Sequence, residues 1–366
     1  MRAQDLIAQI FKARARIPLY RLATESCIIL GHVRIGDLEA KPGTKMHGYI
    51  KIGEFPTGYL VQYPIMILNG AKRGRILCLI AGIHAMEYCG IETVMRLFTR
   101  IDPCKLSGAI VAVPLVNIPA FQARVPYVNP VDRVNGFGLG KGGVGEGSMS
   151  YIMGEVLFQK VLSKADALIN LHGGDSVEEN LDFVIVNETG ETEIDRISKD
   201  MAKCFCSDYM WLYHADVTWI KDAGGNWIKT SENRKNGGLH KRTMIPTVIP
   251  EAGGSGKMQE GSVRFLYDGI VNVMKYLRML SGKPAMSEPR VFHTQHRVKV
   301  RSSGFFLSSK SLGDIVSKGE MIGSVKNIFG EVIETVTSPV DGVFDFLMFH
   351  PSVLPGDVVM IIGELA

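Results

Sequence analysis

The chain has 366 residues, of which 46% are hydrophobic and 21% charged, and its formal net charge is +4 at pH 7. Such a chain can bury one large core and a smaller second one, and the small charge with scattered Lys and Arg argues against a nucleic-acid-binding protein. No apolar run approaches the roughly 20 residues of a membrane-spanning helix and no early segment reads as a signal peptide, so we expect a cytoplasmic protein with a small-molecule partner and no membrane contact.

Hydrophobic periodicity predicts alternating strands and helices before residue 281. Strands are expected at residues 46–53, 59–68, 75–82, 108–114, 165–171, 183–187 and 247–251, and those at 75–82 and 165–171 read as buried. Helices are expected at residues 3–14, 91–100, 151–164, 193–206 and 261–280. Because strands that alternate with helices form sheets covered on both sides, we expect an α/β fold with a mostly parallel or mixed sheet flanked by helices.

The sequence changes character after residues 281–289, a stretch of Gly, Pro, Ser and Lys that we interpret as a linker. Beyond it come short strands, frequent glycines and no helical pattern. We therefore predict a larger domain at 1–285 and a smaller, all-β domain of the barrel-sandwich type at 286–366. Its glycine pattern resembles the small domains that carry biotin or lipoate, but the turn after Lys326 lacks the usual setting of the modified lysine. We expect it to be structural.

Two histidines follow apolar strands. His84 comes after the strand at 75–82 and begins a His-x-x-Glu tetrad that ends at Glu87, and His172 follows the strand at 165–171. Sites in open α/β sheets lie at the carboxyl ends of strands, and a helical turn after His84 would bring imidazole and carboxylate to one face. Two imidazoles and a carboxylate suit catalytic zinc, so we predict one Zn²⁺ per chain. The alternative is a structural histidine, since one His-x-x-Glu among nine histidines is weak evidence.

Glu251 is the candidate for proton transfer. It follows the apolar run at 247–250 and precedes two glycines, the same placement as the histidines. A carboxylate beside zinc-activated water can take a proton and return it to the leaving group. The alternative is a helix-capping or surface carboxylate. Arg124 is the nearest candidate in the sequence for stabilising an oxyanion. These residues together predict metal-assisted attack on a carbonyl, most naturally that of an amide.

At this point the sequence resembles the succinylglutamate desuccinylase/aspartoacylase family, a branch of the zinc carboxypeptidase-like fold. Residues 81–88 are similar to the family's Gly-x-His-x-x-Glu segment, residues 170–173 to its third-ligand strand, and residues 250–253 to its catalytic glutamate segment. The resemblance implies a zinc carboxypeptidase-like fold with a C-terminal β domain. It also implies that the zinc ligands are His84, Glu87 and His172 and that Glu251 is the general acid/base.

One segment departs from the family pattern. The family commonly holds the substrate carboxylate with an Asn-Arg pair, but an ungapped match places Phe137 and Gly138 there, within a Gly-rich candidate binding loop at 129–147. Either another cation takes over, or the substrate is less charged than is usual, or the register differs and Arg133 has the usual role. The candidate cations are Arg133, Arg124 and Lys141, and the candidate substrate-binding residues are Arg133, Asn135, Phe137 and Lys141.

The leading hypothesis is a zinc-dependent hydrolase that cleaves the amide bond of an N-acylated amino acid or small amine. A metallocarboxypeptidase on short peptides is a second hypothesis, which the missing Asn-Arg pair disfavours. A catalytically silent binding protein on the metal scaffold is a third, which the presence of Glu251 disfavours. The acyl group, the amine and the formation of a homo-oligomer are left open by the sequence.

Overall fold

The computed structural model describes residues 28–29, 31–55, 57–134, 147–213 and 245–365. Helices in these ranges are α2 (Tyr88–Arg100), α3 (Ile118–Ala123), α4 (Met149–Lys160), α5 (Thr192–Lys203) and α8 (Glu260–Tyr276), with 3₁₀ turns η1 (Pro103–Lys105) and η3 (Leu162–Lys164). Strands up to the last helix are β1 (Ile28–Ile29), β2 (His32–Ile35), β3 (Leu38–Ala40), β4 (Thr44–Glu54), β5 (Leu60–Asn69), β6 (Lys72–Ile80), β7 (Ser107–Val113), β8 (Ala167–Asn170), β9 (Glu178–Asn187), β10 (Tyr209–Tyr213) and β11 (Thr247–Gly254). Later strands are β12 (Arg290–Phe292), β13 (Gln295–Lys299), β14 (Gly304–Ser308), β15 (Ile315–Val316), β16 (Met321–Lys326), β17 (Val332–Thr337), β18 (Gly342–Met348), β19 (Ser352–Val353) and β20 (Val358–Glu364).

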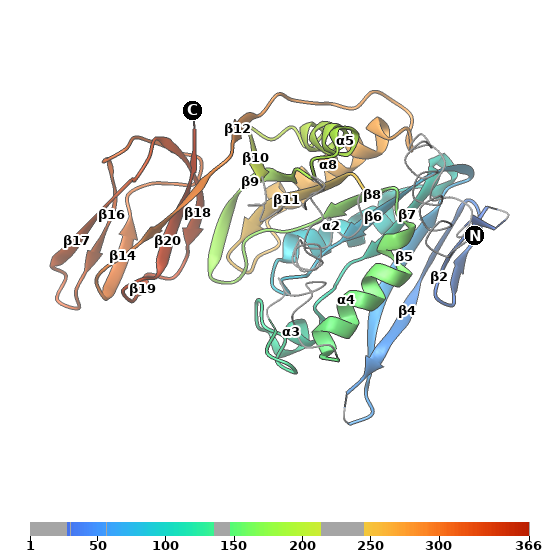
Figure 1. Ribbon diagram of the computed structural model, residues 1–366, viewed down its shortest axis with the longest axis horizontal. Helices are drawn as coiled ribbons and strands as arrows, with labels where there is room; N and C mark the ends of the chain where they lie inside the picture. The colour runs from blue at the N-terminus through green and yellow to red at the C-terminus, as the bar shows by residue number, and fades with distance from the viewer. Residues whose placement is uncertain (1–27, 30, 56, 135–146, 214–244, 366) are drawn as a thin grey trace, which may run out of the picture.

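Thirteen of the described strands hydrogen-bond into one mixed sheet (Figure 1). Its main path runs β13, β20, β18, β9, β11, β8, β6, β7, β5, β4, while β10 and β12 extend from β9 and β15 pairs with β18. The central strands β7, β6, β8 and β11 are parallel to their neighbours in this group, and β5, β4 and β9 are antiparallel to theirs on this path. The predicted α/β fold with a mixed sheet flanked by helices is confirmed.

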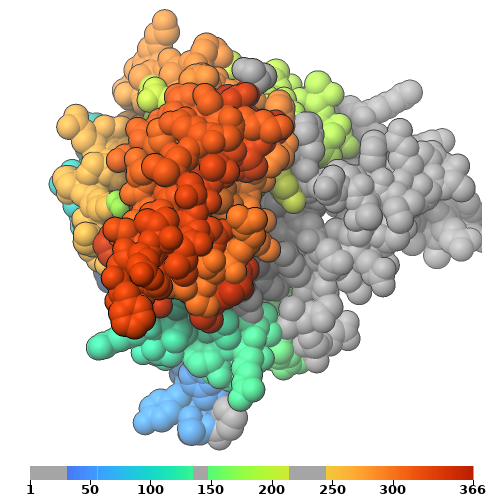
Figure 2. Space-filling model, turned by 90° about the vertical axis from the view of Figure 1, so that its left-hand side faces the viewer, coloured from blue at the N-terminus to red at the C-terminus, as the bar shows by residue number. Residues whose placement is uncertain are grey.

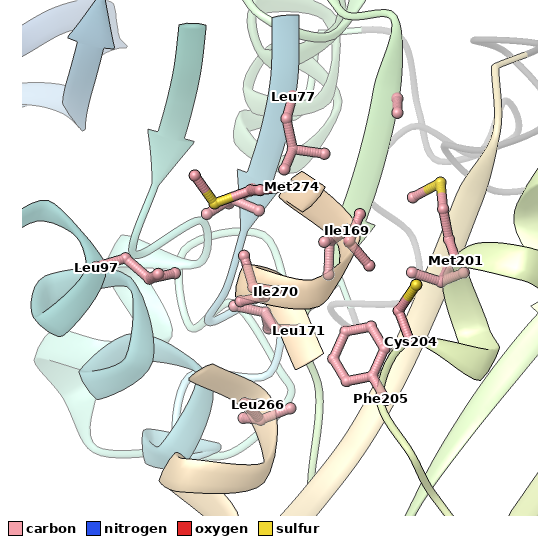
Figure 3. Packing of buried hydrophobic residues seen from close by; sticks show 14 of the residues in the cluster. Leu77, Leu97, Ile169, Leu171, Met201, Cys204, Phe205, Leu266, Ile270 and Met274 are labelled. Atoms are coloured by element: carbon pink, nitrogen blue, oxygen red, sulfur yellow. The ribbon is translucent and has the colours of Figure 1, made fainter. Parts of the chain in front are cut away.

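Strand β6 illustrates how the sheet is covered on both faces. Leu77 and Leu79 join a buried cluster with residues of α2, α5 and α8, whereas the alternate residues of β6 join a second cluster with residues of α4. Figure 3 shows part of the first cluster, in which Leu77 and Ile169 of the sheet lie among side chains of the helices. A strand buried on both faces reads as a continuous apolar run, so its carboxyl end could be located from the sequence.

The C-terminal β-rich region is joined to the rest of the sheet through β18. Residues 342–347 of β18 pair with β20, and residues 346–348 also pair antiparallel with β9. The described strands β17, β16, β14 and β19 form a separate sheet in that order. Side chains of this sheet share one hydrophobic cluster with side chains of β13, β18 and β20. This region, orange to red, faces the viewer in Figure 2. The main sheet therefore continues into the C-terminal region, which the sequence did not indicate.

Two element boundaries differ from the prediction in ways that affect the site. Strand β9 begins at Glu178, before the strand predicted at 183–187, and β11 continues past Glu251 to Gly254. Backbone pairing with β11 and β18 holds the polar start of β9 in a strand, which its side chains do not signal. The helix predicted at 3–14 and most of the loop at 129–147 lie outside the described residues. The boundary between 285 and 286 stays a prediction.

No helix in the described ranges combines the length and the apolar composition needed to cross a bilayer.

Candidate functional site

The loop between β6 and α2 carries His84 and Glu87. The two residues do not lie on a helical turn, because α2 begins only at Tyr88. Gly82 turns the chain with a φ of +65°, and a Cβ added there would lie 2.8 Å from the Leu115 side chain. The backbone N–H of Glu87 donates to the carbonyl of His84 at 3.4 Å. This loop turn, rather than a helix face, brings the imidazole and the carboxylate together.

The side chains of His84, Glu87 and His172 converge at the carboxyl ends of β6 and β8. One potential ligand atom from each lies within 4.8 Å of those of the other two, and all three residues are buried. One carboxylate oxygen of Glu87 contacts Nδ1 of His84, and the other lies 3.0 Å from Nδ1 of His172. The two imidazole rings meet edge to face with centroids 4.8 Å apart. Two nitrogen donors and one carboxylate in this arrangement fit the donor set of zinc.

Pairing between opposite charges dominates the electrostatics of this group. Burial alone would raise the pKa of the Glu87 carboxyl, but the charges of His84 and His172 outweigh it and hold that pKa below its ordinary value. Burial alone would lower the pKa of His172, but the negative charge of Glu87 outweighs it and raises that pKa to about 9. Imidazoles must lose this proton before they coordinate a metal, so metal binding here would release protons.

Strand β11 brings Glu251 next to His172. The backbone N–H of His172 donates to the carbonyl of Pro250 at 2.9 Å, and the N–H of Ala252 donates to the carbonyl of His172 at 3.1 Å. His172 and Glu251 thus form a parallel bridge. Gly173 permits this approach, since a Cβ there would lie 2.1 Å from the carbonyl oxygen of Ala252. Glu251 is within a strand rather than at its end, yet its backbone still pairs with that of His172.

The environment of Glu251 favours the protonated carboxyl. Burial, opposed by the charge of His172 and reinforced by the negative charges of Glu87 and Glu178, raises the pKa of Glu251 to about 8. The Nδ2 of Asn180 donates to Oε2 of Glu251 at 3.0 Å. A carboxyl group with a pKa near neutrality can both take and give a proton.

Tyr127 contacts His84 and links it to Glu178. The Tyr127 ring packs edge to face on the His84 ring with centroids 4.9 Å apart, and its hydroxyl donates to Oε1 of Glu178 at 2.5 Å. Burial raises the pKa of Glu178 to about 7; the charges of Asp175 and Glu87 act in the same direction, and the Tyr127 hydrogen bond opposes them. The described surroundings of His84 are therefore rich in carboxyl groups.

The other predicted residues are two exposed arginines and three residues outside the described ranges. Arg124 is exposed and ends α3 with a φ of +54°, three residues before Tyr127. Arg133 is also exposed, in a turn where its N–H donates to the carbonyl of Asn129 at 2.8 Å. Neither arginine is placed among the buried side chains of the site. The three remaining candidates, Asn135, Phe137 and Lys141, lie outside the described residues.

Sequence reasoning missed Tyr127, Glu178 and Asn180. Tyr127 belongs to the segment after β7, whose apolar pattern does mark a third strand exit at this edge of the sheet. The residues Glu178 and Asn180 begin β9, and their polar character gave no strand signal. The exit of β7 was the one available clue, because open sheets collect functional residues at such ends.

Comparisons with known proteins identify the family of this chain. The catalytic-domain model of the succinylglutamate desuccinylase/aspartoacylase family matches residues 73–277. A relative from Halomonas elongata, N-alpha-acetyl-L-2,4-diaminobutyric acid deacetylase, is 23% identical over 330 residues, which are 87% of this chain and 91% of that protein.

Solved structures share the fold. A succinylglutamate desuccinylase/aspartoacylase from Rhodobacter sphaeroides has a TM-score of 0.73 at 20% identity, with 88% of this chain and 95% of that one covered. The product-bound ectoine utilization protein of Ruegeria pomeroyi has a TM-score of 0.74 at 20% identity, with 89% and 96% covered. Since the family model spans more than half of the chain, including the strand exits and the glutamate strand described above, this chain belongs to the succinylglutamate desuccinylase/aspartoacylase family.

Proposed function

We propose that this protein is a zinc-dependent deacylase that hydrolyses the amide bond of an N-acylated amino acid or small amine. The observation that carries the proposal is the buried group of two imidazoles and a carboxylate with Glu251 bridged to one of the histidines. Membership of a family of deacylases supports the reaction class. The donor set supports zinc.

Each residue has a separate role in this proposal. His84, Glu87 and His172 would hold the ion, which when bound lowers the pKa of water from about 15.7 towards about 7 and polarises a carbonyl group. Glu251 takes the proton of the attacking water and delivers it to the amine nitrogen as the amide bond breaks. Its raised pKa suits both halves of that transfer. Arg124 remains the predicted oxyanion donor, although its exposed place at the end of α3 gives this role no added support.

The charges around His84 favour substrates with an amino group over dicarboxylates. Burial and the charges of Asp175 and Glu87 raise the pKa of Glu178, and the charge of Glu178 in turn helps to raise that of Glu251. A substrate ammonium group relieves this repulsion, whereas a second carboxylate adds to it. The relative from Halomonas elongata, whose named substrate carries a free amine, supports the same class. We propose N-acetylated diamino acids or diamines as first substrates.

Two alternatives remain to be tested. A metallocarboxypeptidase would cleave dipeptides and would need to hold the terminal carboxylate. A silent binding protein would bind zinc and ligand without turnover. The carboxyl-rich surroundings of His84 add to the argument against the carboxypeptidase.

The test combines metal analysis with a substrate panel. Wild type is expected to bind about one zinc per chain, which His84→Ala loses, and to hydrolyse N-acetyldiaminobutyrate faster than N-acetylaspartate or succinylglutamate. Glu251→Gln is expected to keep zinc and lose turnover by about 100-fold or more. Glu260→Gln, the same substitution at an exposed residue of α8, is the control and should retain activity. Zinc binding without turnover of any panel member would favour the binding protein, and dipeptide cleavage the carboxypeptidase.

A further inference from the structure

Strand β9 is irregular where it passes Glu251. Glu251 of β11 pairs with Phe183, but Gly253 pairs with Asn180, so one residue of β11 faces two residues of β9, Leu181 and Asp182. This is a β-bulge with the extra residue on β9. In a regular antiparallel ladder Gly253 would face Leu181, and a leucine would share the face of Glu251. The bulge puts Asn180 on that face instead.

The side chains of Asn180 and Asp182 both form hydrogen bonds with β11. Asn180 donates from Nδ2 to Oε2 of Glu251 at 3.0 Å. Asp182 accepts from the backbone N–H of Gly253 at 3.1 Å and from the hydroxyl of Ser262 at 2.9 Å. The Asp182 carboxylate thereby satisfies a backbone donor of the irregular ladder and ties the bulge to the start of α8. The position of Asn180 is therefore fixed by the fold and is not a chance surface contact.

The C-terminal region pairs with Asn180 on the edge of β9 opposite to β11. Phe346 of β18 pairs with Asn180, and Met348 pairs with Glu178. The N–H of Phe349 donates to the carbonyl of Val177, which continues this pairing past the end of β18. Asn180 is thus flanked by β11 on one side and by β18 on the other.

We propose that Asn180 is a positioning residue that holds the Glu251 carboxyl group for proton transfer, and that β18 of the C-terminal region keeps Asn180 in place. A carboxyl group with one oxygen held by a donor has one preferred rotamer and presents its second oxygen in a fixed direction. This inference rests on the proposed role of Glu251. It also gives the C-terminal region a part in the site without requiring any of its side chains to touch substrate.

The first arm of the test measures the contact without using activity. Asn180→Ala, Glu251→Ala and the double variant are made in the full-length, zinc-loaded protein, and their thermal midpoints are compared. Asn180→Ala should lower the midpoint by on the order of 2 °C or more in wild type and by clearly less in Glu251→Ala, since the partner is already gone. Equal shifts in the two backgrounds would show that the two side chains are not coupled and would overturn the proposal.

The second arm measures turnover on the best substrate of the panel. Asn180→Ala and the similarly sized Asn180→Leu, which has no donor, should each lower kcat about tenfold or more while KM changes less than about threefold. Asn187→Ala, at the far end of the same strand, is the control and should leave both constants unchanged. A wild-type kcat in a folded Asn180→Leu variant would overturn the proposal. Failure of wild type to turn over any substrate would instead refute the proposed function, and the thermal cycle would still decide the contact.

Discussion

Two buried carboxyl groups in different regions of the molecule have opposite pKa shifts. Glu87, at the site, and Asp345, in β18, are 3% and 1% exposed. The pKa of Glu87 lies below its ordinary value because the charges of His84 and His172 outweigh burial. Burial dominates at Asp345 and raises its pKa to about 7, although Gln295 donates to Oδ2 at 2.7 Å.

The comparison shows that the partner, and not the depth, decides the state of a buried acid. Two imidazoles supply positive charge and keep Glu87 ionised, which is the state that a metal requires. A neutral amide supplies one hydrogen bond, which does not offset burial, so the pKa of Asp345 lies near neutrality and well above its ordinary value. Asp345 lies at an irregularity of β18, next to the residues that also pair with β9. The same carboxyl chemistry thus gives a binding group in one region and a stability cost in the other.

The largest expected effect is that of Glu87→Gln, which removes the charge but keeps the size. In the metal-free protein the substitution leaves His172 buried without its counter-charge, and we expect a loss on the order of 3 kcal/mol in the free energy of unfolding at pH 7. Zinc affinity should fall more than about 100-fold. Denaturant unfolding in the presence of a chelator measures the first effect, and competition titration with a zinc dye the second. A variant as stable as wild type that still binds zinc tightly would contradict the role given to the charge of Glu87.

The sequence predicted some residues of the site and missed others, for a structural reason. His84, His172 and Glu251 were found because each follows or ends a continuous apolar run, and such runs mark strands buried on both faces. Asn180 was not found, because its place depends on a bulge against a strand about 70 residues later and on β18 beyond that. A pattern along the chain carries no information about such register shifts.

The loop at the site shows a second limit. The His-x-x-Glu spacing indicated that His84 and Glu87 would meet, but it suggested a helical turn. The structure has a loop there, which is held by hydrogen bonds to the segment that follows β7. One of these is donated by the N–H of Ala85 to the carbonyl of Pro126 at 2.8 Å. Such contacts join residues that are distant in sequence, so spacing predicted the meeting of the side chains and not its cause.

Asp345→Asn should have the next largest effect on the free energy of unfolding, and it should stabilise the protein rather than destabilise it. The pKa of Asp345 is higher in the folded protein than in the unfolded chain, so the folded state binds its proton more tightly, and stability from this group falls as the pH rises from about 4 to about 7. The asparagine variant has no such loss. It should match wild type near pH 4 and exceed it by on the order of 2 kcal/mol at pH 8, as measured by denaturant unfolding at the two pH values. A gain of the same size at both pH values would contradict the assigned pKa.

Gln295→Ala should have the smallest effect. It removes the one side-chain hydrogen bond to Asp345 found among the described residues. Because this hydrogen bond lowers the pKa of Asp345, its loss should raise that pKa further and extend the decline in stability to higher pH. At pH 8 the cost should be about 1 kcal/mol in wild type and less in Asp345→Asn, whose amide oxygen accepts from Gln295 without carrying charge. Unfolding of the four proteins of this cycle at pH 8 measures the coupling. If Gln295→Ala costs the same in both backgrounds, the amide does not act on the charge of Asp345, and burial alone sets the state of that carboxyl group.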